Sequence, residues 1–170
     1  MKGAAQLVIG SFVNLSAVRR AALRWGGAPV LLVCSGTKGE RSDEDELFAG
    51  VVALQLLQVL GGAGPGDPVR GDVGDEATLE VLKRVAEIFE QPLEVSVAGS
   101  AAAPTPTPAG GGRGPAACAA ALEKTIREST NGQMLARLGL VEDFEVILDV
   151  DRFDSTLPTY NSATDCFTQP

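Results

Sequence analysis

The stretch PVLLVCSGTKGERSDEDELFAG, residues 29–50, decides the expected fold. It begins with an apolar run without alternation, which is typical of a strand buried on both faces of a parallel sheet. A loop with two glycines follows, and Ser42 then precedes a helix expected over Asp43–Leu60 and ended by Gly61 and Gly62. A buried strand that leads through a glycine loop into a helix is the repeating unit of an α/β fold.

The preceding segment repeats this order. Gln6–Phe12 (QLVIGSF) predicts another buried strand, and residues 15–25 predict a helix capped by Asn14 or Ser16. Strand, helix, strand and helix in succession favour right-handed crossovers. We therefore expect an α/β protein in which a parallel sheet carries helices on both faces, a three-layer α/β/α arrangement.

The rest of the chain gives weaker signals. Residues 61–74 are rich in Gly, Pro and Asp and predict a loop, whereas Asp75–Gln91 predicts an amphipathic helix. Two shorter helices are expected at 118–129 and 133–138. Residues 144–150 (FEVILDV) are compatible with either a strand or a helix.

A low-complexity segment divides the sequence. Residues 99–117 (GSAAAPTPTPAGGGRGPAA) predict a disordered insert, because Pro and Gly prevent packing. We interpret residues 1–98 as an α/β core with the loop motifs. Residues 118–170 are then the C-terminal part of the same α/β unit.

Composition excludes several functions. The net charge is −8 and the pI is about 4.5, so the basic footprint of a nucleic-acid-binding protein is absent. An anionic substrate would need a local cation, either a metal ion or a placed Arg or Lys. The sequence has no histidine, which removes Ser-His-Asp and Cys-His catalysis and every His-based metal site.

The cysteines and apolar runs bear on location. Cys34, Cys118 and Cys166 are widely spaced and odd in number, which fits neither a zinc site nor a disulfide framework. A reducing compartment, the cytoplasm, is therefore expected. The longest apolar runs are about ten residues, too short to cross a membrane, so no membrane partner is expected.

The acidic loop allows three interpretations, of which the first is a cysteine phosphatase. CSGTKGERS, residues 34–42, places a thiol before a glycine loop with an arginine at its end. Six residues separate Cys34 from Arg41, one more than the tight cradle of such enzymes has. No histidine precedes the cysteine to support a lowered pKa, and the nearby acids disfavour a thiolate.

The second interpretation is a magnesium-assisted phosphate site, and the third is a well-capped helix. Mg²⁺ prefers one or two carboxylates, several waters and substrate phosphate oxygens, so Glu44 and Asp45, with Asp43 in reserve, are candidate ligands. Equally, Ser42 followed by acids resembles a capping box, and acids in a first helical turn are favoured by the helix dipole. Cys34 by itself is then a small buried residue at the end of a strand.

A second polar loop, Gly10–Asn14, follows the first expected strand. Ligands of open α/β sheets bind at the carboxyl ends of the strands, so Ser11 and Asn14 are expected at the same crevice as Ser35–Ser42. The alternative is that Asn14 only caps a helix.

Two motifs resemble a known family. IGSFVNLSAV (9–18) and VLLVCSGTKGERSDEDELFAG (30–50) are similar to stretches of the 2-phosphosulfolactate phosphatase family of coenzyme M biosynthesis. STNGQMLARLGLVEDFEV (129–146) and STLPTY (155–160) resemble its C-terminal part, although Asn131 stands where the family has His. The resemblance implies a Mg²⁺-dependent phosphatase of the α/β class that releases sulfolactate and phosphate from a small anionic phosphorylated substrate.

The sequence also departs from that family. Family chains begin with a further segment that carries Asp-x-x-Arg-Ala-Thr-Thr and Thr-Thr-Asn-Gly-Thr stretches, and neither is present. The resemblance therefore implies an N-terminally truncated member. Two hypotheses follow, an active phosphatase or a catalytically incomplete paralogue that acts as a binding or interaction module. A sheet exposed by truncation would favour a homo-oligomer.

These considerations assign the candidate site residues. Those expected to take part in catalysis are Ser35, Thr37, Glu44 and Asp45, of which Glu44 and Asp45 would bind Mg²⁺. Those expected to bind substrate are Ser11, Asn14, Cys34, Gly36, Lys38, Gly39 and Ser42.

Overall fold

The computed structural model describes residues 5–64, 67–100 and 115–169, without the side chains of 115–117. The chain divides into two compact units, Met1–Val30 with Leu140–Pro170 and, separately, Leu31–Gly139. Helices are mixed with strands, and one small sheet is parallel, which agrees with the predicted α/β class. The described residues do not build a clear three-layer α/β/α arrangement.

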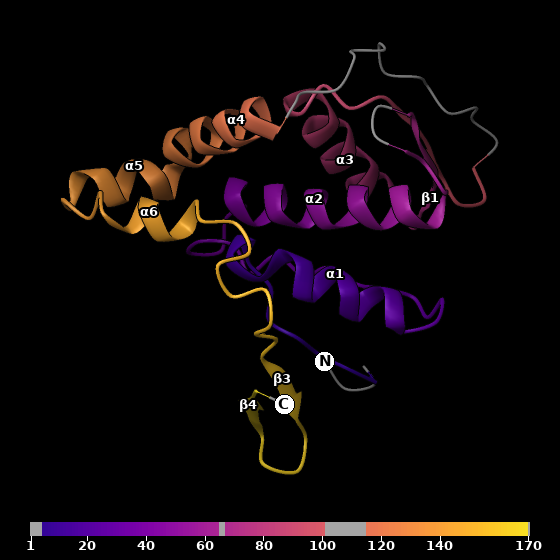
Figure 1. Ribbon diagram of the computed structural model, residues 1–170, viewed down its shortest axis with the longest axis horizontal. Helices are drawn as coiled ribbons and strands as arrows, with labels where there is room; N and C mark the ends of the chain where they lie inside the picture. Colours follow the sequence, from indigo (N-terminus) through magenta and orange to yellow (C-terminus); the bar gives the residue numbers. More distant parts are fainter. Residues whose placement is uncertain (1–4, 65–66, 101–114, 170) are drawn as a thin grey trace. The chain divides into compact units, whose positions relative to one another are not determined.

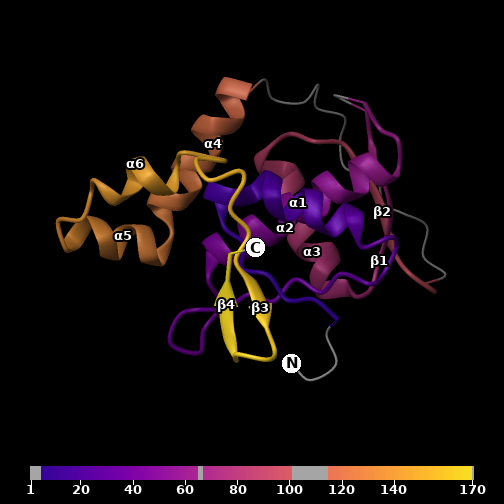
Figure 2. The same cartoon turned by 60° about the horizontal axis from the view of Figure 1, so that its bottom comes forward.

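The unit Leu31–Gly139 is built around a β–α–β segment. Strand β1 (Val69–Val73) leads into helix α3 (Glu76–Ile88), and strand β2 (Leu93–Val97) pairs with β1 in parallel (Figure 2). The register runs from Val69 opposite Leu93 to Val73 opposite Val97. Parallel strands need a crossover connection, and α3 supplies it.

The helix predicted over Asp75–Gln91 is confirmed as α3, but the strand β1 before it was not predicted. Asp75 caps α3, because its carboxylate accepts a hydrogen bond from the backbone N–H of Thr78 at 2.7 Å. The predicted loop at 61–74 instead contains β1. Its central residues, Arg70 to Asp72, are polar or glycine, so the pairing with β2 and not the local pattern makes it a strand.

Helix α2 (Asp43–Leu60) has the bounds that the sequence predicted, and it packs against α3. The two helices approach closely at Gly50, where an added Cβ would lie 2.5 Å from Cγ2 of Val85. Much of the core lies between these helices and the β1–β2 pair. The buried apolar residues of this unit are Leu47, Val52, Leu54, Leu56, Val69, Val73, Leu79, Leu82, Val85, Ala86, Leu93, Val95, Leu122 and Ile126.

No helix within the described ranges is both long enough and apolar enough to cross a membrane.

Two further helices of this unit, α4 (Pro115–Glu128) and α5 (Thr130–Arg137), meet at Ser129. The predicted helices at 118–129 and 133–138 are confirmed, each with an earlier start. The disorder predicted for 99–117 falls mostly on residues outside those described, and α4 already begins within that segment.

The other unit combines both ends of the described chain (Figure 1). A 3₁₀ turn at Phe12–Asn14 leads into α1 (Leu15–Arg24), which confirms the helix predicted over residues 15–25. Helix α6 (Asp143–Ile147) settles the ambiguity of that segment in favour of a helix. Strands β3 (Thr159–Asn161) and β4 (Cys166–Thr168) form an antiparallel hairpin.

Two predicted strands are not formed. Residues 6–12 contribute only an isolated antiparallel bridge between Val8 and Thr159, and Pro29–Cys34 forms no strand with any described residue. Leu31 and Val33 are 83% and 63% exposed, so the apolar run is not buried either. An apolar run becomes a strand only where a neighbour supplies hydrogen bonds, and the described residues supply none here.

Candidate functional site

The loop before α2 has a tight and defined conformation. Thr37 and Glu40 exchange two backbone hydrogen bonds of 3.0 Å. The residues between them, Lys38 and Gly39, both have positive φ angles, 54° and 85°, as in a type I′ hairpin turn. Gly36 has φ +71°, and a Cβ there would lie 2.4 Å from the carbonyl oxygen of Glu40. The backbone therefore requires glycine at this position.

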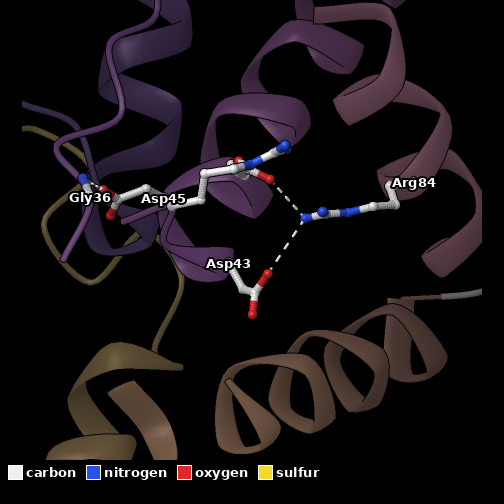
Figure 3. A network of polar contacts seen from close by, with 6 residues as sticks. Gly36, Asp43, Asp45 and Arg84 are labelled. Carbon is white, nitrogen blue, oxygen red and sulfur yellow. Dashed lines mark hydrogen bonds and ion pairs between the residues drawn. The ribbon is translucent and has the colours of Figure 1, made fainter. Parts of the chain in front are cut away.

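Asp45 fastens this loop to the first turn of α2. Its Oδ2 accepts a hydrogen bond from the Ser35 hydroxyl at 3.0 Å. It also accepts one from the Gly36 N–H at 2.9 Å (Figure 3). Three predicted site residues are thus brought together. The Gly36 N–H, expected to point at phosphate, is bonded to this carboxylate instead.

Glu44 is joined to the same loop through a residue that the sequence prediction missed. The side-chain Nδ2 of Asn131, in α5, donates to the Glu44 carboxylate oxygen Oε1 and to the Thr37 hydroxyl, the latter at 2.8 Å. Thr37 and Glu44 are therefore brought together, as predicted. Asn131 lies 87 residues from Glu44, and no local pattern could have connected them.

The other two acids in the first turn of α2, Asp43 and Glu46, are bound by arginines instead. Arg84 of α3 donates to Glu46 at 2.9 Å and lies 3.7 Å from Asp43, while Arg41 donates to the other oxygen of Glu46 at 2.5 Å. In Figure 3, Asp43 points to Arg84 whereas Asp45 points to Gly36. Hydrogen bonding to Arg41, with a smaller contribution from Arg84, lowers the pKa of Glu46 against the opposing effect of its burial.

Cys34 does not have the environment of a nucleophile. The residue is exposed and not buried at a strand end, contrary to the structural interpretation of the sequence. Partial desolvation, followed by the charges of Asp45 and Glu46, raises the pKa of its thiol, and Arg41 opposes the shift only weakly. The Arg41 guanidinium binds Glu46. The geometry therefore disfavours the cysteine phosphatase interpretation.

Ser42 lies at the N-terminal boundary of α2 but does not cap it with its side chain. Its carbonyl oxygen accepts the first helical bond, from the N–H of Glu46 at 3.1 Å, while its hydroxyl makes no capping hydrogen bond. The predicted capping box is therefore wrong. Ser42 is buried, whereas Lys38 and Gly39 at the tip of the turn are exposed.

Ser11 and Asn14, the other predicted binding residues, belong to the unit that combines Met1–Val30 with Leu140–Pro170. Asn14 is buried, and its Nδ2 donates to the carbonyl oxygens of Ile9 and Thr156, both at 3.1 Å. Its Oδ1 accepts from the N–H of Ser11 at 2.8 Å. These bonds shape the chain around α1, and the role of both residues in substrate binding stays a prediction.

A pocket of about 230 Å³ lies among α2, α3 and α4. Its lining includes the charged residues Asp43, Arg84 and Glu128 and the apolar residues Leu47 and Val85. The pocket is on the side of α2 that carries Asp43, whereas Asp45 faces the glycine loop.

The carboxylate and hydroxyl oxygens beside the loop are of the kind that binds a magnesium ion. Across the described ranges, no three His, Cys, Asp or Glu side chains gather into a metal cage. Mg²⁺ needs no such cage, since it is commonly bound by one or two carboxylates together with water and phosphate oxygens. Asp45 Oδ1 and Glu44 Oε2 have no hydrogen-bond partner among the described residues, so one oxygen of each remains for a ligand.

The fold and this loop define a mixed α/β protein with a hydroxyl- and carboxylate-rich site at the start of a helix. A family model described as 2-phosphosulpholactate phosphatase matches residues 1–97, more than half of the 170-residue chain. The chain belongs to the 2-phosphosulpholactate phosphatase family. Its function is accordingly phosphatase-like in class. No curated protein and no solved structure matches it.

Proposed function

We propose that this chain is a Mg²⁺-dependent phosphatase that hydrolyses a phosphate monoester, 2-phosphosulfolactate, to sulfolactate and phosphate. The family supports the class of reaction. The observation that carries the proposal is that two adjacent carboxylates lie at one short hydroxyl-bearing loop: Asp45 bonds Ser35 directly, and Asn131 bonds both Glu44 and the Thr37 hydroxyl. Each carboxylate keeps an oxygen for a ligand at the place where the loop offers hydroxyl groups.

The hydrogen bonds assign donors and acceptors within the loop. Thr37 Oγ1 accepts from Asn131, so its own hydroxyl hydrogen is available for a phosphate oxygen. The Ser35 hydroxyl donates to Asp45 and keeps its lone pairs. Lys38 is exposed at the tip of the turn and adds a positive charge close to these groups. In the proposed site Thr37 and Lys38 bind the phosphate.

The acids next to the loop would repel a phosphate dianion unless a cation lay between them. Glu44 and Asp45 are the residues that would hold Mg²⁺, through the two oxygens left without partners. When bound, the ion supplies Lewis-acid stabilisation of the charge on the phosphoryl oxygens. The arginines do not replace it, because Arg41 and Arg84 are bonded to Glu46.

The test is phosphate release from 2-phosphosulfolactate by the purified chain, with Mg²⁺ and then with EDTA. We expect release that EDTA abolishes. Asp45→Asn should lower kcat/KM by more than about a hundredfold, because it removes a ligand charge and disturbs the Ser35 anchor. Glu87→Gln, an exposed acid of α3, is the matched control and should keep the wild-type rate.

Two outcomes contradict the proposal. Release that continues unchanged in EDTA would show that the metal assignment is wrong. Calorimetric binding of sulfolactate, phosphate or Mg²⁺ without any hydrolysis would instead favour the alternative function, a non-enzymatic binding module.

A further inference from the structure

We infer that Asn131 is a positioning residue of the proposed phosphatase site, which orients the Glu44 carboxylate and the Thr37 hydroxyl toward the ligand. The inference rests on the proposed function. It also extends the site beyond residues 1–97, the part matched by the family, into helix α5 on the far side of the Gly- and Pro-rich segment.

The contacts of Asn131 use both hydrogens of its amide. A side-chain amide nitrogen carries two donors, and here one is directed to Glu44 and the other to Thr37. Asn131 is half-buried, so water competes less for these donors than it would at an exposed position. The hydrogen bond to Glu44 has a charged acceptor and is therefore the stronger of the two.

The consequence for Thr37 and Glu44 is a loss of rotational freedom. A glutamate side chain in a first helical turn samples several rotamers, and fixing it has an entropic cost on binding. With Oε1 bonded to Asn131, only Oε2 is left to meet a cation. With Thr37 Oγ1 already accepting a hydrogen bond, the hydroxyl hydrogen must point away from Asn131.

Asn131 is itself held rigidly by the corner between α4 and α5. The buried Ser129 hydroxyl donates to the carbonyl oxygen of Ile126 at 2.8 Å and accepts from the N–H of Gly132 at 3.1 Å. A Cβ on Gly132 would lie only 2.0 Å from the Ile126 carbonyl oxygen, so the chain passes itself closely at this corner. The backbone next to Asn131 therefore has little freedom to shift.

The experiment compares Asn131→Ala and Asn131→Asp with the control Gln133→Ala in the full chain. Gln133 is an exposed residue of the same helix, whose amide bonds the Glu128 carbonyl oxygen. Phosphate release is measured as a function of Mg²⁺ at a temperature where circular dichroism shows each variant to be fully folded. The readout is the Mg²⁺ concentration that gives half-maximal activity, checked against the Mg²⁺ dissociation constant measured by calorimetry on the protein without substrate.

We expect Asn131→Ala to raise that concentration by about tenfold to a hundredfold, the usual effect of removing a group that orients a metal ligand. Asn131→Asp should be worse than Asn131→Ala, because a carboxylate cannot donate to Glu44 and repels it. Gln133→Ala should match the wild type.

Each result supports the inference or overturns it. An active wild type with the same Mg²⁺ dependence in Asn131→Ala as in Gln133→Ala would refute the positioning role and leave the proposed function standing. The positioning role requires Asn131→Asp to raise the Mg²⁺ concentration more than Asn131→Ala does. Equal increases would refute it, because a general disturbance of the structure would affect both variants alike. A wild type without Mg²⁺-dependent release refutes the proposed function, and the inference falls with it.

Discussion

Glu46→Gln is the substitution that best separates the acids bonded to arginines from the acids beside the glycine loop. The Glu46 side chain is 10% exposed and receives charge-assisted hydrogen bonds from Arg41 and Arg84. One such bond contributes about 1.5–3 kcal/mol to stability. The two arginine side chains are 70% and 48% exposed, so water partly replaces them, and we expect a total loss of about 2 kcal/mol rather than the sum.

The assay is urea unfolding of the wild type, Glu46→Gln and the control Glu87→Gln at pH 7. The control removes an exposed acid of α3 and should change the free energy of unfolding by less than about 0.5 kcal/mol. Glu46→Gln should keep phosphatase activity in the folded protein, because Glu46 bonds the guanidinium groups of Arg41 and Arg84 and none of the proposed site residues.

The difference between wild type and Glu46→Gln should also depend on pH. The bond from Arg41, and then the charge of Arg84, hold the pKa of Glu46 below its ordinary value. The unfolded chain therefore takes up a proton on this glutamate at a higher pH than the folded chain does. The stabilisation is complete above the unfolded pKa of about 4.3, and it is lost as the pH falls through the lower pKa of the folded state.

Two results would refute this reasoning. The first is a Glu46→Gln variant as stable as Glu87→Gln at pH 7, which would mean that the arginines lose nothing when the carboxylate is removed. The second is a stability difference that stays constant or grows on acidification below about pH 4.

Two further predictions concern packing and capping. Gly50→Ala should lower the free energy of unfolding by about 1 kcal/mol or more, because overpacking against Val85 outweighs the gain in helix propensity. Gly74→Ala, whose added Cβ meets nothing within 4 Å, serves as the control. A more stable Gly50→Ala protein would mean that α2 and α3 move apart at little cost. Ser129→Ala should lose about 1–2 kcal/mol in the same urea assay, because its hydroxyl caps α5, while Ser42→Ala removes no capping bond and should lose clearly less; equal losses would show that the cap of α5 contributes nothing.

Local signals predicted the helices well. The bounds of α2 follow from an acidic first turn, a largely apolar stretch and Gly61 at its end, all of which lie within the helix or next to it. Asp75, the first residue of the predicted helix, caps α3 through an equally local contact, because its carboxylate bonds the N–H three residues away. The site loop was likewise visible as a glycine turn before acids, since Gly36 and Gly39 supply positive φ angles locally.

The strands show where local signals stop. The apolar run Pro29–Cys34 predicted a buried strand, yet Leu31 and Val33 are exposed, while the polar segment of β1 forms a strand because β2 pairs with it. A strand depends on hydrogen bonds to a second segment, and the sequence of one segment does not show which other segment will pair with it.

The sequence by itself determined most of the helices, the glycine turn and the set of acids beside it, because capping, backbone φ angles and helical periodicity act within a few residues. Only the tertiary structure decided which of these acids lie at the candidate site. In the folded chain Glu46 bonds Arg41 and Arg84, and Asp45 bonds Gly36. Asn131 bonds Glu44 although 87 residues separate them in the sequence. The physical reason is that a carboxylate bonds whichever donors the packing of the helices places beside it, and that placement is a property of the whole unit.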